Sequence, residues 1–272
     1  MTVRIKVRSP IAAALTGHHS HMRRDYIYPH RSVRSMRVTI KRIVLAVLTA
    51  AALITIVAAR NDDLFYSHNR LCVAILKLAE IPAGGEQIVD VFPGFGRAAV
   101  PGTPVTRLET NPIRIGLLFA AGLIVLIAVY RRFPLARGFV LFLLALLLIT
   151  AVAVSFLPKS TQFGAVEFSQ IWLRGEILVW LLLPLFSAGM FMLIQPYWLT
   201  GVCWTVGVQA FGFLWSAARL AFCIGVMHFS GVLFIPLLWF ALGLLADMVY
   251  LMVFYSMAVH WSTSRYWGRR AE

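Results

Sequence analysis

Charged side chains are scarce in this sequence, at 13% of its 272 residues, roughly half of the 25% that is typical of a globular domain. Acidic residues are the scarcest, with 11 Asp and Glu against 25 Lys and Arg. Hydrophobic residues reach 60%, and the mean hydropathy is +0.80, so a soluble globular domain is excluded. The basic excess does not indicate a nucleic-acid partner, because these residues are not spread over a soluble surface.

Cysteine is rare as well, and Cys72, Cys203 and Cys223 do not form a spaced set. Two of the three lie in apolar stretches, so we expect neither a disulfide framework nor a zinc site. Three histidines cluster near the N-terminus, but a solvated tail explains them better than a metal site does. We therefore expect no cofactor and no metal.

Long apolar runs predict an all-α polytopic membrane helix bundle with about six transmembrane helices. A helix needs about 20 residues to cross a bilayer core of about 30 Å. The stretch 197–260 is more than twice as long, so it must fold back at least once. It contains Arg219, His228 and Asp247 within its apolar sequence. The expected spans lie near residues 43–59, 115–130, 138–157, 177–194, 199–228 and 232–259.

Basic residues at both chain ends indicate the orientation. Residues 1–42 hold ten Lys and Arg against one acid, which predicts a disordered cytoplasmic arm that contacts anionic lipid headgroups. Met36 is an alternative start, and an uncleaved first span is favoured over a signal peptide. Three arginines lie in 131–137 and three in the tail 261–272. By the positive-inside rule we expect a bacterial inner membrane protein with both termini cytoplasmic.

The one sizeable polar segment, residues 60–112, is expected as an outside loop. Its first part has apolar residues at near-helical spacing, which predict an amphipathic helix on the membrane surface or on the bundle. These residues are Leu64, Leu71, Cys72, Ile75 and Leu78. Proline and glycine dominate from Pro82 to Pro112 and predict a loop. Residues 158–176 form a second expected loop, with a polar helical face made by Glu167, Gln170 and Arg174.

Arg219 is the foremost candidate functional residue, because a guanidinium deep in an apolar helix needs a partner. Asp247 and Glu176 are the available carboxylates, and a structural ion pair that locks two helices is one interpretation. The other is a site for an anion or a carbonyl oxygen near the outer leaflet. His228 is either an interfacial histidine or a proton carrier, and on a regular helix it faces away from Arg219. Cys223 follows Arg219 by one turn, and simple burial explains it better than a reactive thiolate does.

The outer end of the penultimate helix resembles the C-terminal half of the exosortase/archaeosortase family. The resemblance rests on two pieces separated by eight residues, Ala217-Ala218-Arg219 and His228-Phe229-Ser230-Gly231. It implies a transmembrane cysteine transpeptidase that cuts C-terminal sorting signals, often near exopolysaccharide genes, with Arg219 and His228 at matching positions. The region that would carry the family's nucleophile, Ile171 to Leu185, has no cysteine. Glu176 lies there and is the third candidate catalytic residue, although a glutamate needs chemistry different from that of a thiolate.

Three functions therefore stay open from the sequence. An exosortase-like protein of surface-protein sorting or polysaccharide export, active or catalytically silent, would act on an exported protein substrate. Its processing would be lost in Arg219→Ala and His228→Ala variants that still insert. A non-enzymatic scaffold or assembly subunit of a larger membrane complex would tolerate His228→Ala and co-purify with partners. A small transporter that uses Arg219 and Asp247 is the third, and the lack of internal repeats disfavours it.

Overall fold

The structure, a computed structural model, describes residues 39–92, 95–105, 121–128, 137–156, 164–195 and 197–268. Within these ranges the chain is helical apart from one two-stranded sheet, so the all-α prediction is confirmed. The elements are α2 (Ile40–Ala59), α3 (Asn61–Leu78), β1 (Glu86–Phe92), β2 (Phe95–Pro101), α5 (Arg137–Phe156), α6 (Ala165–Ile194), α7 (Trp198–Ser230), η3 (Gly231–Phe234), α8 (Ile235–Leu242) and α9 (Leu244–Gly268). Residues 121–128 are helical too.

Four helical segments of the described chain are long and apolar enough to cross a membrane. They are Ile40–Ala59, Ala165–Ile194, Trp198–Ser230 and Ile235–Ser262. These correspond to four of the six predicted spans, and the protein is a membrane protein by this criterion. The loop predicted at 158–176 is wrong from Ala165 onward, because α6 begins there. The carboxylate of Glu167 caps its first turn by accepting a hydrogen bond from the Gly164 backbone N–H at 2.9 Å.

The other two predicted spans are not confirmed. Most of the expected span 115–130 lies outside the described residues, and only 121–128 is seen as helix. The expected span 138–157 coincides with α5, but its apolar stretch Gly138–Thr150 is short for a crossing. The basic arm up to residue 38, the arginines at 131 and 132 and the end of the tail also lie outside the described residues.

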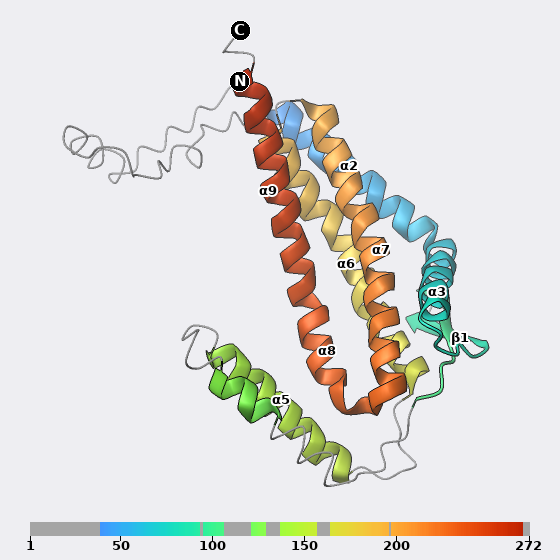
Figure 1. Cartoon of the computed structure of the whole chain (residues 1–272). Coiled ribbons are helices and arrows are strands. Elements are labelled where there is room, and N and C mark those ends of the chain that lie inside the picture. Colours follow the sequence, from blue (N-terminus) through green and yellow to red (C-terminus); the bar gives the residue numbers. More distant parts are fainter. Residues whose placement is uncertain are drawn as a thin grey trace, which may run out of the picture.

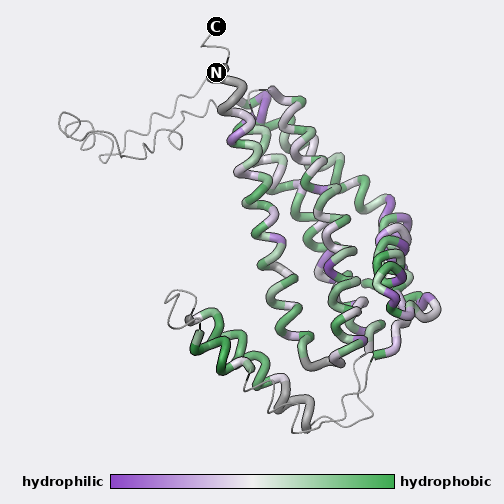
Figure 2. The backbone as a smooth tube through the Cα atoms, in the orientation of Figure 1, coloured by the Kyte–Doolittle hydropathy of each residue, from purple (hydrophilic) through white to green (hydrophobic). Residues whose placement is uncertain are grey.

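The bundle consists of α2, α6, α7 and α8–α9, which lie side by side (Figure 1). The start of α2 and the end of α9 lie at the same end of this bundle, and α3 and the hairpin lie toward the other end. α5 and the 121–128 helix lie together beside it, and α5 contacts η3 and α8. Hydrophobic residues dominate the bundle helices and α5, whereas hydrophilic residues gather on α3 and the hairpin (Figure 2).

α3 confirms the helix predicted in the polar segment 60–112 but buries a different face from the one expected. It packs against α7 and β2, and its buried residues are Phe65, His68, Asn69, Cys72 and Leu76. Of the five residues in the predicted apolar face only Cys72 is buried, and Leu78 is 88% exposed. Polar contacts as well as hydrophobicity determine which face of α3 is buried. One such contact is the hydrogen bond that Asn69 Nδ2 donates to Glu86 Oε1 at 3.1 Å.

The loop predicted from Pro82 onward is wrong in its first part, because β1 and β2 form an antiparallel hairpin with Glu86 opposite Pro101. Val91 and two residues of β2 face the core. The polar face predicted on α6 holds this hairpin in place. Gln170 Nε2 donates to the Asp90 carbonyl at 2.8 Å, and Arg174 Nε donates to the Val91 carbonyl at 2.6 Å.

The stretch predicted as one final helix is divided. Gly231, with φ of 64°, ends α7 at the expected place. A short η3 turn and α8 follow, and the chain breaks at Gly243 before α9 begins. A Cβ atom at Gly243 would lie 2.3 Å from the Trp239 carbonyl oxygen, so this break requires glycine. It falls directly beside the buried arginine.

Candidate functional site

Arg219 projects from α7 into the centre of the bundle and is only 2% exposed. Its Nη2 atom lies 2.8 Å from Glu176 Oε1 on α6 and 2.7 Å from Asp247 Oδ1 on α9. The structure thus brings together Arg219 and the two carboxyl residues that the sequence analysis named as its available partners. Both candidate carboxyl partners are used at once, and the contact joins three helices instead of two.

The break between α8 and α9 supplies the rest of the arginine's coordination. Nη1 donates hydrogen bonds to the carbonyl oxygens of Leu242 and Gly243, the latter at 3.0 Å. Carbonyl groups at the C-terminal end of a helix have no intrahelical partner and carry partial negative charge. The end of α8 therefore satisfies a cation that would otherwise be costly to bury.

A histidine that the sequence analysis did not select extends this cluster toward α3. His68 Nε2 lies 3.1 Å from Ser216 Oγ on α7, and the Ser216 hydroxyl also hydrogen-bonds to the Glu176 carboxyl group. Burial, and secondly the charge of Arg219, lower the pKa of His68 from 6.5 to about 3. His68 is therefore neutral at ordinary pH and acts as a hydrogen-bonding group between α3 and α7.

Several buried polar atoms around Arg219 have no hydrogen-bond partner within the described structure. They are Trp172 Nε1, Arg219 Nε, Asp247 Oδ1 and Tyr250 Oη. The Trp172 ring also lies 5.5 Å from the Arg219 guanidinium carbon, which places the cation over an aromatic face. Asp247 is thus at ion-pair distance from Arg219 without good hydrogen-bond geometry, which distinguishes it from Glu176.

His228 lies apart from this cluster, although it was a candidate to act with Arg219. It sits at the end of α7, nine residues or about 13 Å along the helix axis from Arg219. Its Nδ1 atom is 2.8 Å from the Pro104 carbonyl oxygen, and its ring is half-buried. His228 therefore connects the end of α7 to the chain that follows β2.

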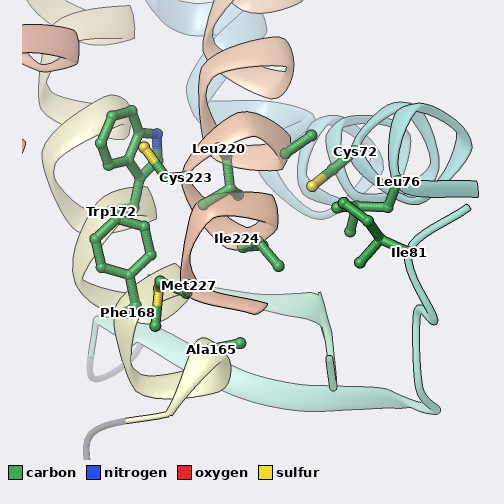
Figure 3. Close-up of a cluster of buried hydrophobic side chains, with 11 residues drawn as sticks. Cys72, Leu76, Ile81, Ala165, Phe168, Trp172, Leu220, Cys223, Ile224 and Met227 are labelled. Atoms are coloured by element: carbon green, nitrogen blue, oxygen red, sulfur yellow. The ribbon is translucent and has the colours of Figure 1, made fainter. Parts of the chain in front are cut away.

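Cys223 is fully buried in an apolar cluster formed by side chains of α3, α6 and α7 (Figure 3). Cys72 belongs to the same cluster, and burial, with the nearby Cys223, raises the pKa of Cys72 to about 12. Neither thiol resembles a reactive cysteine, which needs exposure and a stabilised thiolate. Cys203 is exposed on the bundle surface, far along α7 from Arg219. None of the three takes the place of the nucleophile that the family resemblance requires.

The cluster is enclosed: Glu176 and Asp247 are each 5% exposed. A groove of about 550 Å³ lies between α7 and α8–α9, but aromatic and aliphatic side chains line it, among them Phe211, Trp215, Val249 and Phe254. Within the described ranges no three His, Cys, Asp or Glu residues are placed to hold a metal ion. The arrangement can hold charge and transmit hydrogen bonds between four elements, and it presents no open face to a substrate.

No family model, curated protein or solved structure matches this chain.

Proposed function

We propose that this chain is a non-enzymatic membrane subunit that anchors or assembles a larger membrane complex. The observation that supports this proposal is the enclosure of Arg219, whose guanidinium is 2% exposed and engaged by two carboxyl groups and two carbonyls. A reactive or transport site needs convergent polar groups in an accessible cavity. Groups that satisfy one another inside the bundle serve instead to fix the positions of three helices.

The uneven burial of the candidate spans favours partners within the membrane. The spans Ala165–Ile194 and Trp198–Ser230 have 44% and 56% of their most apolar window buried, so α6 and α7 form the centre. The spans Ile40–Ala59 and Ile235–Ser262 have only 17% and 12% buried. α2 and α9 therefore expose long apolar surfaces that lipid or the helices of another membrane protein can cover.

Photo-crosslinking from these surfaces tests the proposal. A crosslinking side chain at Met252 on α9, which is 67% exposed, is expected to capture a membrane protein in intact cells. The same group at Ala258, which is fully buried on α9, serves as the matched control. A His228→Ala variant should retain the crosslink. If Met252 captures only lipid, and His228→Ala abolishes processing of an exported protein, the proposal is wrong.

An exosortase-like processing activity has less support. Arg219 and His228 stand at the positions that match the family, but they lie apart, and His228 contacts a backbone carbonyl. α6 places Glu176 against Arg219 in the region where the family has its cysteine. A catalytically silent relative that retains the arginine for helix packing would agree with both observations. The His228→Ala experiment distinguishes the active form from the silent one.

We further propose six crossings of a bacterial inner membrane with both termini in the cytoplasm. The start of α2 and the end of α9 lie at one end of the bundle, which supports an even number of crossings. The 121–128 helix and α5 would supply the additional pair, with the arginines of 131–137 in their cytoplasmic connection. Residues 1–42 would then meet the anionic lipid headgroups of the inner leaflet.

A further inference from the structure

We propose that the Arg219 cluster is a proton-binding site, in which the carboxyl group of Asp247 holds one exchangeable proton taken from water. The bound proton makes the buried cluster electrically neutral. Its release would leave one unbalanced negative charge between α6, α7 and α9. This inference does not depend on the proposed function, because it concerns the charge state of the bundle itself.

The charges in the cluster do not balance without an added proton. One guanidinium faces two carboxyl groups, and all three side chains are at most 8% exposed. If both carboxyl groups were ionised, the sum would be −1 in a region shielded from water. An isolated buried charge costs several kcal/mol, and the usual response of a protein is to neutralise the group.

Among the described residues, no other side chain around the cluster supplies the missing positive charge. The facing titratable groups are His68 and Cys72 on α3, Glu176 on α6, Cys223 on α7 and Tyr250 on α9. His68 is neutral, and the remaining groups carry no positive charge in any state. Arg174 lies two residues before Glu176 but bonds to the Val91 carbonyl on another face of α6.

Hydrogen bonding assigns the proton to Asp247 instead of Glu176. Glu176 receives hydrogen bonds from Arg219 Nη2, at 2.8 Å, and from the Ser216 hydroxyl. Hydrogen bonds of this kind stabilise the ionised form of a carboxyl group. Asp247 shares the same Arg219 Nη2 atom at 2.7 Å, with poor geometry at Oδ1, and has no second hydrogen-bond donor among the described side chains. The less stabilised carboxylate is therefore the one that takes up the proton.

Infrared spectroscopy of the full-length chain in lipid tests the proposal directly. At neutral pH we expect one carbonyl stretching band from a protonated carboxyl group, and we expect it to shift when aspartate carboxyl carbons carry a heavy isotope. Asp247→Asn should abolish the band, because Arg219 and Glu176 then balance. Asp90→Asn is the matched control, since that exposed aspartate pairs only with Arg97 at the surface, and it should keep the band.

The pH dependence of thermal unfolding is a second test for the proposed bound proton. The folded chain binds one more proton than the unfolded chain, so stability should fall as pH rises above about 6.5, where His68 no longer contributes. The unfolding equilibrium should change by up to about tenfold per pH unit, and Asp247→Asn should lose this slope. The proposal is overturned if the wild-type chain has no protonated-carboxyl band at neutral pH. It is overturned equally if the band persists in Asp247→Asn.

Discussion

Arg219 joins more elements of this protein than any other described side chain, because its guanidinium contacts α6, α9 and the end of α8. Replacing it by methionine keeps much of the side-chain volume but leaves two carboxyl groups without their cation. Removing one partner of a buried ion pair costs about 3–5 kcal/mol. We expect Arg219→Met to lower the free energy of unfolding in detergent by this amount.

The matched variant combines Arg219→Met with Glu176→Gln and Asp247→Asn, which removes every charge of the cluster. Replacing a whole buried ion group by neutral residues is often close to neutral for stability. The combined variant should therefore recover most of the loss. If it unfolds as readily as Arg219→Met alone, the energy comes from packing around the arginine and not from its charge.

His68 is expected to make the folded chain less stable as the pH falls. Its pKa is lowered from 6.5 to about 3 in the folded chain by burial and by Arg219. Between these values the unfolded chain binds a proton and the folded chain does not, so stability is lost as pH falls from about 6.5 toward 3. In an Asp247→Asn background, where no proton bound at residue 247 opposes this dependence, the unfolding equilibrium should shift by up to about tenfold per pH unit. His68→Gln, which keeps a hydrogen-bonding group near Ser216, should remove this acid dependence in pH-resolved melting curves.

The residues of the cluster were not equally predictable. A charge inside an apolar span is costly, so the sequence identifies Arg219 and Asp247 directly. Glu176, at the end of an expected loop, was named only as an available carboxyl partner and by the family resemblance. His68 lies in a polar segment, where a histidine is ordinary. Its role becomes visible only when α3 is packed on α7 and Ser216 lies 3.1 Å away. The one available signal was its position one turn before Cys72, on a face that proved to be buried.

At the scale of elements, the break at Gly243 decides where Arg219 finds its carbonyl partners. A Cβ atom there would lie 2.3 Å from the Trp239 carbonyl oxygen, so Gly243→Ala forces a backbone shift. Shifts of this kind cost about 1–3 kcal/mol, and this one also moves two acceptors of the guanidinium. We expect a lower melting temperature in Gly243→Ala. Gly207→Ala is the control, because open space surrounds a Cβ atom at that position; equal melting temperatures in the two variants would contradict this account.

The hairpin depends on α6 for its position. Arg174 donates to the Val91 carbonyl and lies over the Phe92 ring, and hydrogen bonds that involve a charged group contribute about 1.5–3 kcal/mol. Arg174→Ala should therefore speed amide hydrogen exchange in β1 by roughly ten- to a hundredfold, with little change in α7. Arg97→Ala removes an exposed side chain of β2 and should leave exchange in β1 nearly unchanged. Equal effects from the two variants would mean that α6 does not tether the hairpin.

The two kinds of element differed in how far sequence patterns could predict them. Apolar runs such as those of α2 and α7 are fixed by the length that a bilayer crossing demands, so their bounds agree closely with expectation. The hairpin was missed because its strands are short, and the prolines and glycines around them favour a loop. Its edge is stabilised by α6, far away in the sequence, and no local pattern reports such a contact.

At the scale of the whole molecule, polar side chains mark two different places. One is the enclosed cluster within the bundle, where Arg219 pairs with both Glu176 and Asp247. The other is the hydrophilic surface of α3 and the hairpin, toward the end opposite the start of α2 and the end of α9 (Figure 2). His68 and Ser216 connect the two. A displacement of α3, for example by a bound partner, would therefore change the hydrogen bond between His68 and Ser216 and then the one between Ser216 and Glu176.

The position of α3 at one end of the bundle leads to a prediction about membrane topology. If the bundle crosses the membrane along its length, α3 must lie on the side opposite the start of α2 and the end of α9. Leu78 at the end of α3 is 88% exposed, so a cysteine there should react with a membrane-impermeant maleimide added to the outer face of intact cells. Leu182→Cys, on the apolar surface of α6, is the control and should stay unlabelled because lipid covers it. Tags at the two termini should both become accessible only after the membrane is opened. If Leu78→Cys is labelled only in opened membranes, α3 lies in the cytoplasm and the proposed orientation of the bundle is reversed. This follows because α3 lies toward the end of the bundle away from the start of α2 and the end of α9.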